Sequence, residues 1–250
     1  MNHPLQGRVA VVTGAARNIG RAIAVTMGRQ GASVVINAVN SAEAAAITAQ
    51  LVRQAGGEAM VCLADITDPA AGQKLMAQAA AHFGGIDILV NNAAIRREAE
   101  FDALDYAQWR EVTSVILDGA YICAHAAAPF LRQSTAGSII NIGGMSAHSG
   151  SARRAHVLAA KAGLVGLTHA LAYDLAADSI TANCVVPGLI DTVRGAAAGG
   201  NPEHHARAGT LLGRRGTAEE VAALVCFLAG PDARYITGQT IHANGGAFLT

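Results

Sequence analysis

The sequence predicts an α/β protein built on a doubly wound, parallel, seven-stranded sheet with helices on both faces, in one domain covering residues 1–250. Short β-branched runs alternate with longer Ala-rich segments of helical period along the whole chain, which is the pattern of a parallel sheet with helical crossovers. The runs lack strict polar alternation, as expected for strands buried on both faces. With 52% hydrophobic residues, the chain can form a core that needs no disulfide or metal.

The strands are expected where β-branched and aliphatic residues cluster, as in RVAVVT, SVVIN, EAMVCL, IDILVN, SIINI and ITANCVV. In chain order they cover residues 8–13, 33–37, 58–63, 86–91, 138–142, 180–186 and 239–243. Helices are expected between them at 18–30, 41–55, 69–83, 105–132, 155–177 and 217–229. Ligands of such sheets bind at the carboxyl ends of the strands, where the strand order reverses.

Charge and cysteine content exclude several classes of protein. Lys and Arg (18) balance Asp and Glu (18), so no basic surface for nucleic acid or an anionic membrane is expected. The longest uncharged stretch, 133–152, is too rich in Gly, Ser, Asn and His to span a membrane. The N-terminus lacks the features of a signal peptide. Four separated cysteines in apolar stretches indicate reduced core residues of a cytoplasmic protein, and no metal site is expected: Cys62, Cys123, Cys184 and Cys226.

Residues 189–216 form a long connection in which Gly and Ala are interspersed with Arg and His. A connection of this length without strong periodicity is commonly a lid or a mobile loop. We interpret it as a substrate flap.

The first expected strand ends in a Gly-rich turn, Thr13 to Gly20, and a helix follows at once. Glycines in this place let the backbone approach a pyrophosphate, and the helix N-terminus supplies amide donors. Such a turn by itself is weak evidence, and its position after the first strand strengthens it.

Further motifs make the chain resemble the short-chain dehydrogenase/reductase family, in particular its 3-oxoacyl-(acyl carrier protein) reductases, along nearly its whole length. The turn is similar to the family's TGxxxGIG, with Asn18 in place of the middle Gly, a mild change because Asn tolerates left-handed backbone. Residues 91–94 (NNAA) resemble NNAG, residues 187–192 resemble PGxIxT, and Asp65 resembles an adenine-contacting Asp. The resemblance implies a Rossmann-type fold and a nicotinamide cofactor. It assigns cofactor contacts to Gly14, Arg17, Asn18, Ile19, Gly20, Asn37, Ser41, Asp65, Ile66, Asn91, Ala93, Lys161, Pro187, Gly188, Ile190 and Thr192.

The 2′ position of the adenosine ribose distinguishes NADP(H) from NAD(H). Proteins of this fold that bind NAD place a carboxylate at the end of the second strand. That strand here ends without one, while Arg17 matches a position that NADP-preferring relatives fill with Arg, and Asn37 and Ser41 could add neutral hydrogen bonds. NADP(H) is therefore favoured over NAD(H), the alternative being that Arg17 is a solvated surface residue.

The catalytic positions depart from the family's pattern. The family's pattern is a Tyr, a Lys four residues later, a Ser thirteen residues before the Tyr and an Asn on the preceding helix. In this sequence the four positions are, in that order, Val157, Lys161, Gly144 and Ile116. Only Lys161 is retained, and in the family it also binds the nicotinamide ribose. In an apolar pocket its pKa could fall, and it could then act as the acid.

Three further side chains are candidates for the missing donor. His156 precedes the Tyr position, although a step of one residue turns about 100° around a helix, so it could equally face a neighbouring helix or subunit. Ser146 and His148 follow the fifth strand, with a role as ordinary polar loop residues as the alternative.

Arginines surround the segments that rim the family's substrate pocket. Arg96, Arg154 and Arg194 are the candidates for binding an anionic substrate, since guanidinium groups pair with carboxylates or phosphates. Arg97 and Arg153 lie beside them, and any one of these arginines could instead be solvated or ion-paired.

Three functions remain open. The first is a cytoplasmic NADP(H)-dependent oxidoreductase acting on a small, anionic molecule with a nonstandard proton donor. The second is an NADP-binding sensor or inactive partner without redox turnover, and the third is a lyase or hydrolase on the same scaffold. The helices at 105–132 and 155–177 resemble those through which the family assembles, so a homotetramer or homodimer is expected.

Overall fold

The computed structural model describes residues 3–192 and 209–250. Its centre is a seven-stranded, wholly parallel sheet with the order β3-β2-β1-β4-β5-β6-β7, which confirms the predicted fold class. The strands are β1 Val9–Val12, β2 Ser33–Ala38, β3 Glu58–Leu63, β4 Ile88–Asn91, β5 Ser138–Ile142, β6 Thr181–Pro187 and β7 Thr240–Ala243. The order reverses between β1 and β4, so a crevice opens at their carboxyl ends.

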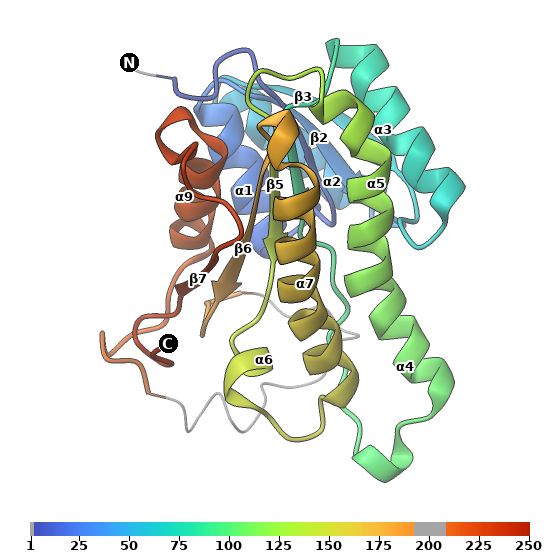
Figure 1. Cartoon of the computed structure of the whole chain (residues 1–250), viewed down its shortest axis with the longest axis vertical. Coiled ribbons are helices and arrows are strands. Elements are labelled where there is room, and N and C mark those ends of the chain that lie inside the picture. Colours follow the sequence, from blue (N-terminus) through green and yellow to red (C-terminus); the bar gives the residue numbers. More distant parts are fainter. Residues whose placement is uncertain (1–2, 193–208) are drawn as a thin grey trace.

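Helices cover both faces of the sheet (Figure 1). One layer contains α1 Asn18–Arg29, α2 Ala42–Gln54 and α9 Ala218–Ala229, and the other contains α3 Pro69–Phe83, α5 Gly119–Leu131 and α7 Ala155–Asp174. Two further helices, α4 Tyr106–Thr113 and α6 Ser146–Ser149, lie at the carboxyl end of the sheet.

The core consists of two apolar layers, one on each face of the sheet. Small residues let the helices approach closely: a Cβ added at Gly28 of α1 would meet Val52 Cγ1 of α2 at 2.7 Å. This close packing accounts for the high Ala and Gly content that the sequence shows.

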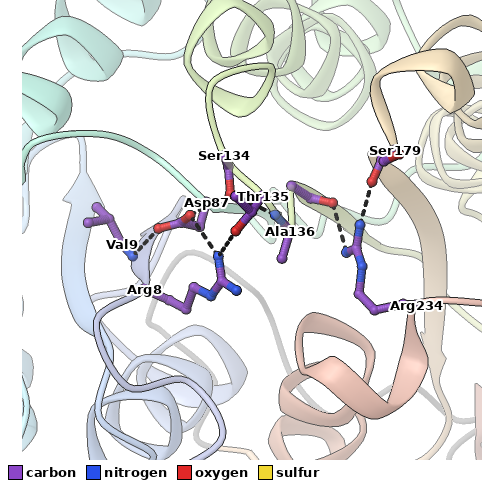
Figure 2. Close-up of polar contacts among 9 residues, drawn as sticks. Arg8, Val9, Asp87, Ser134, Thr135, Ala136, Ser179 and Arg234 are labelled. Atoms are coloured by element: carbon purple, nitrogen blue, oxygen red, sulfur yellow. Dashed lines mark hydrogen bonds and ion pairs between the residues drawn. The ribbon is translucent and has the colours of Figure 1, made fainter.

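The amino end of the sheet is held by a polar cluster (Figure 2). The Asp87 carboxylate accepts hydrogen bonds from Val9 N at 2.8 Å and from Ser134 Oγ at 2.5 Å, and Arg8 pairs with it at 3.2 Å. Arg234 donates to the carbonyl oxygens of Gly137 and Ser179. The cluster joins the amino ends of β1, β4, β5 and β6, at the edge of the sheet opposite the crevice.

The element boundaries match the expectations closely, with one break. The helix expected at 105–132 is divided by a π-helical turn, Ser114–Asp118, between α4 and α5. Such turns recur at functional sites, and this one holds Ile116, which occupies the position of the family's Asn. The sequence analysis did not anticipate α6 or the short 3₁₀ turns Phe101–Ala103, Ala176–Asp178 and Pro231–Ala233.

Two helical stretches, Tyr106–Leu131 and Ala155–Asp174, are long and apolar enough to cross a membrane by length and composition. In each, 39% of the apolar window is buried inside the molecule. Core helices of soluble proteins meet the same test, and α5 and α7 both pack on the sheet. The finding is weak evidence for a span.

Asn18 has a left-handed backbone, with φ of 51°. This agrees with the expectation that an Asn tolerates left-handed backbone at this position of the turn. We expect Asn18→Val to lower the free energy of unfolding by about 1–3 kcal/mol, because a β-branched residue is strained there, and Asn18→Gly to cost little. Urea denaturation measures both changes, with Asn40→Val as the control at an exposed Asn outside the left-handed region. Equal losses for Asn18→Val and Asn40→Val would contradict the interpretation.

Candidate functional site

A cavity of about 480 Å³ lies in the crevice at the carboxyl ends of β1, β4, β5 and β6. It is bordered by the Gly-rich turn, the segment after β4, the segment after β5, the first turns of α7 and the segment after β6. Fourteen of the predicted site residues line it: Gly14, Arg17, Asn18, Ile19, Gly20, Ala93, Arg96, Ser146, Arg154, Lys161, Pro187, Gly188, Ile190 and Thr192.

The Gly-rich turn is held against the end of β4 by Thr13 and Asn92. Thr13 Oγ1 accepts hydrogen bonds from the amides of Asn92 and Ala93 at 3.0 and 3.1 Å, and Asn92 Nδ2 donates to Thr13 O and Gly14 O at 2.8 and 3.1 Å. A Cβ on Gly14 would meet Ala93 Cα at 2.8 Å. Only glycine fits there, so the turn and the segment after β4 form one wall.

The end of the cavity next to β2 has a positively charged side chain, and none of the described residues that line the cavity is a carboxylate. Arg17 is exposed and lines the cavity beside Val39, which follows β2. The exposed residues after β2 are Val39 and Asn40, neither of them acidic. A positive charge without a neighbouring carboxylate is the feature on which the expectation of NADP(H) rests.

Asn37 does not reach this end of the cavity, which corrects the expectation of a ribose contact. Its side chain is 1% exposed, with Nδ2 donating to Cys62 O at 3.3 Å and Ala64 O at 3.0 Å. Its Oδ1 accepts from Gly14 N at 3.4 Å. The amide is therefore used to hold β2, β3 and the Gly-rich turn together.

Four other predicted cofactor residues lie outside the cavity wall. Ser41 precedes α2, and Asp65 is exposed, with Oδ1 accepting from the Thr67 amide and hydroxyl at 3.0 and 2.8 Å. Ile66 and Asn91 are buried beneath the wall. Their cofactor contacts stay predictions, and their structural role here is to shape the segments around the cavity.

The segment after β6 forms the opposite wall. A Cβ on Gly188 would meet Asn244 Cα at 2.6 Å, so the chain passes directly over the segment after β7. Ile190 pairs with Gly216 in a bridge, and Arg215 donates to Ile190 O at 2.8 Å. These contacts anchor both described ends of the predicted flap, 189–192 and 209–216, whereas Arg194 lies outside the described residues.

The positions of the family's Tyr, Ser and Asn hold no polar side chain. Val157 is 4% exposed and lines the cavity, and Ile116 is buried with it in an apolar cluster. A Cβ on Gly144 would meet only the Lys161 side chain, at 3.7 Å. The cavity is thus open and apolar around the stem of Lys161.

Lys161 is the one lysine of the two in the chain that lies in this cavity, since Lys74 is on the exposed side of α3. Its Nζ donates a hydrogen bond to the carbonyl oxygen of Ile142. Burial lowers the pKa of Lys161 to about 7, and the positive charges of Arg96 and Arg154 act in the same direction. The amine therefore changes its charge near neutral pH, where proton transfer is most effective.

A buried chain of hydrogen bonds runs beneath Lys161. Asn91 Nδ2 donates to Asn141 Oδ1 at 2.9 Å, Asn141 Nδ2 donates to Thr168 Oγ1 at 2.9 Å, and Thr168 donates to Leu164 O at 2.7 Å. Thr168 lies two turns after Lys161 on the same face of α7. The chain therefore fixes α7 against β4 and β5, and with it the position of Lys161.

The two histidine candidates are not brought to the cavity wall. His156 is 1% exposed, and burial and the charges of Arg154 and Arg97 lower its pKa. This orientation corresponds to the alternative of a packed histidine. His148 lies against the His242 ring, 4.7 Å between centroids, so its ring is held by β7 and by Phe248, which follows β7. Ser146 remains in the cavity, where it accepts a hydrogen bond from Arg154 Nη1 at 3.4 Å.

The arginines divide into two groups. Arg97 pairs with Glu111 at 2.5 Å and Arg153 pairs with Glu100 at 3.0 Å, both outside the cavity wall. Of the three arginines that the sequence analysis selected, Arg96 and Arg154 line the cavity, and Arg194 lies outside the described residues.

Some wall residues were missed. Ile95, Val115, Met145 and Leu158 supply apolar surface. Leu158 lies four residues after Arg154 and three before Lys161, so helical spacing could have identified it. The others follow from the packing of separate segments, for which the sequence holds no local signal.

Comparison with known proteins agrees with this geometry. Residues 14–247 match the family model described as enoyl-(acyl carrier protein) reductase. The chain is 36% identical to 3-oxoacyl-[acyl-carrier-protein] reductase FabG of Escherichia coli K12, with 98% of both chains covered. The chain belongs to the short-chain dehydrogenase/reductase family. This family of oxidoreductases accounts for the Gly-rich turn and for the retained lysine.

Solved structures of the family superpose closely on the chain. A dehydrogenase/reductase from Sinorhizobium meliloti 1021 has a TM-score of 0.92 at 34% identity, covering 99% of this chain and 98% of the other. A short-chain dehydrogenase from Burkholderia cenocepacia J2315 in complex with NADP has a TM-score of 0.90 at 36% identity, covering 98% and 99%. Val157, Gly144 and Lys161 therefore lie in a fold that closely matches these solved structures.

The lowered pKa of Lys161 predicts how stability depends on pH. Between about pH 7 and 10.5 the unfolded chain holds a proton on Lys161 that the folded chain has lost, so folding becomes more favourable as pH rises through this window. Lys161→Met removes the cost of burying a charged amine. The variant's free energy of unfolding should therefore exceed that of the native chain by most below pH 7, and by less as the pH rises toward 10.5. Urea denaturation at several pH values measures this change.

Lys74→Met is the matched control, because it alters an exposed lysine on α3. The difference in free energy of unfolding between Lys74→Met and the native chain should vary less with pH than the difference for Lys161→Met. A Lys161→Met difference that is flat from pH 6 to pH 10 would contradict the burial of a titrating amine.

Proposed function

We propose that this protein is an NADP(H)-dependent oxidoreductase that interconverts a carbonyl and an alcohol on a small anionic substrate, with Lys161 as the proton donor. One observation carries the proposal: a single cavity is lined by Arg17 at the adenosine end, Lys161 at the centre and Arg96 and Arg154 at the substrate end. Its charges match a phosphorylated dinucleotide and an anion, and its centre holds a group that titrates.

The residues fit the cofactor. The first turn of α1 presents backbone amides to a pyrophosphate, and Arg17 would hold a 2′-phosphate. Residues 187–192 would hold the carboxamide, and Lys161 the ribose hydroxyls of the nicotinamide half. The bound cofactor supplies or accepts the hydride.

Lys161 supplies the proton in the direction of reduction. The ammonium form donates a proton to the carbonyl oxygen as that oxygen gains negative charge, and the amine then regains a proton from water. A pKa of about 7 lets the same group accept the proton in the reverse direction. Val157 and Ile116 keep this part of the cavity apolar, which strengthens the electrostatic effect of the ammonium group.

Arg96 and Arg154 orient the substrate. A carboxylate or phosphate held by these guanidinium groups would direct the rest of the molecule toward Lys161 between Ile95, Met145 and Leu158. The cavity of about 480 Å³ also has to receive the nicotinamide ring, which restricts the substrate to a small molecule.

A second candidate function is NADP binding without turnover, as in a sensor or an inactive partner. The observation that favours it is the replacement of three polar catalytic positions by Val157, Gly144 and Ile116. The distinction between the two functions is therefore whether Lys161 can replace the missing hydroxyl.

We further propose a cytoplasmic homotetramer or homodimer. Helices α4, α5 and α7 carry apolar surface that the sheet does not cover, and Tyr121 and Tyr173 on this layer are exposed. Apolar surface of this extent is typical of a subunit interface.

The proposed activity predicts that the protein binds NADPH and consumes it with a small oxo acid. Absorbance of NADPH is followed with a panel of 2-oxo and 3-oxo acids and uncharged ketones and aldehydes. Arg17→Met should weaken NADPH binding about tenfold or more and leave NADH binding nearly unchanged, because it removes the contact to the 2′-phosphate.

Arg29→Met is the matched control, at the far end of α1. Equal effects of the two variants on NADPH would contradict the role of Arg17. Tight NADPH binding without consumption over the whole panel would favour the second candidate, and the absence of binding would exclude both.

Arg154 should contribute to substrate binding. Arg154→Met is expected to raise KM for an oxo acid about tenfold or more and to affect an uncharged ketone little, because the variant loses an ionic contact made by the carboxylate. Arg97→Met serves as the control, since Arg97 pairs with Glu111 outside the cavity. Steady-state kinetics with the oxo acid and the ketone measure both effects, and an unchanged KM for the oxo acid would rule out this role.

A further inference from the structure

The surroundings of Lys161 are those of a nucleophilic amine. The side chain lines the cavity, and one N–H is donated to the carbonyl oxygen of Ile142, which orients the nitrogen. At Gly144 no side chain covers the lysine stem: an added Cβ would meet only Cγ and Cδ of Lys161, at 3.7 and 4.0 Å. Val157 offers no hydroxyl to which the amine could donate.

The charge state of the amine agrees with this geometry. Burial, with a smaller contribution from the charge of Arg96, lowers the pKa of Lys161 to about 7. Near neutral pH a substantial part of the protein therefore carries the uncharged amine, which is the form that attacks carbonyl carbon. A desolvated lysine next to a second cation is a recurrent way of activating an amine.

We propose that Lys161 forms an imine with a small oxo acid held by Arg96 and Arg154, and that 3-oxo acids lose CO₂ from this imine. The proposal rests on the anion-binding half of the proposed function, and it adds a carbon–carbon bond cleavage that needs no nicotinamide cofactor. The arginines would fix the carboxylate and thereby place the ketone carbon at the amine.

The step balances without an added oxidant or reductant. The Nζ lone pair bonds to the carbonyl carbon, and the carbonyl oxygen leaves as water. In the protonated imine of a 3-oxo acid, the electron pair of the bond to the carboxylate moves toward nitrogen as CO₂ departs, leaving an enamine. Water then protonates the enamine carbon, and a second water releases the ketone and regenerates the lysine amine.

The two lysines of the chain make a direct test possible. The full-length protein without cofactor is incubated with 3-oxobutanoate and sodium cyanoborohydride, digested and analysed by mass spectrometry. The expected result is a reduced adduct on the peptide that contains Lys161 and at least tenfold less on the peptide that contains Lys74. No adduct on Lys161, or equal labelling of both lysines, would overturn the imine.

The mass of the adduct tests the cleavage. An isopropyl adduct shows that CO₂ was lost, whereas an adduct that retains the carboxylate would support the imine and overturn the decarboxylation. Acetone formed in solution gives the same isopropyl group, so acetone added directly at the same concentration sets the background that 3-oxobutanoate has to exceed. Release of CO₂ above the rate without protein is the second readout.

Variants test the two parts of the proposed site. Lys161→Met and Lys161→Arg should abolish the adduct, and far-ultraviolet circular dichroism shows whether each still folds. Arg154→Met keeps the amine and should lower labelling by 3-oxobutanoate about tenfold more than it lowers labelling by acetone, which has no carboxylate to anchor. An equal loss with acetone would overturn the anchoring role of Arg154.

The outcomes separate this proposal from the oxidoreductase function. Consumption of NADPH without any adduct on Lys161 would overturn the imine and leave the oxidoreductase function in place. An adduct on Lys161 in a protein that does not bind NADPH would support the imine and overturn the oxidoreductase function.

Discussion

The hydrogen bonds between Thr13 and Asn92 hold together the carboxyl ends of β1 and β4, the two strands between which the strand order reverses. Thr13 ends β1, and Asn92 follows β4, its neighbour across the reversal of strand order. Four hydrogen bonds join the two ends, and Gly14 packs directly on Ala93. The crevice opens because the connections that follow these two strands lead to helices on opposite faces of the sheet. This contact therefore determines the shape of the cavity beside the Gly-rich turn.

The other side of the cavity depends on the residue just before Asn92. Successive side chains of a strand point to opposite faces, so Asn91 turns away from the Gly-rich turn and bonds to Asn141 of β5. Asn141 in turn bonds to Thr168 of α7, the helix that carries Lys161. Two adjacent asparagines therefore connect the Gly-rich turn to α7, the helix that carries Lys161, through the sheet. Asn91 Oδ1 has no hydrogen-bond partner, and loss of either amide donor contact would leave a further buried polar group unpaired, at a cost of about 1–3 kcal/mol.

The sequence was sufficient for the features that depend on local chemistry. The strand pattern and the left-handed backbone at Asn18 both follow from short-range rules. It was insufficient where a polar side chain has to choose among distant partners. Asn37 bonds to two carbonyl groups 25 and 27 residues away instead of reaching a ligand.

The histidines illustrate the same limit. His156 is adjacent to Val157 in sequence, yet one step along α7 turns it into the protein, where it is 1% exposed. His148 follows β5, where the sequence predicted a candidate proton donor. Its ring packs on His242, which is 94 residues away in the chain, at 4.7 Å between ring centroids. Similarly, the sequence could not tell which of the neighbouring arginines pair with a glutamate outside the cavity wall. The structure shows that Arg97 pairs with Glu111 and Arg153 with Glu100.

The residues beside Lys161 affect the electrostatics of this lysine. A Tyr or Ser beside Lys161 would accept hydrogen bonds from its ammonium group and so favour the charged form, whereas Val157 and Gly144 provide no acceptor. Arg96 and Arg154 disfavour the charge further, as the direction of the pKa of Lys161 shows. An anion bound by these arginines would offset their charge and raise that pKa again. The bound anion would then favour the ammonium form that donates a proton to a carbonyl oxygen, while higher pH would favour the amine that attacks a carbonyl carbon. Protonation of one buried nitrogen thus separates the two chemistries proposed for the same cavity.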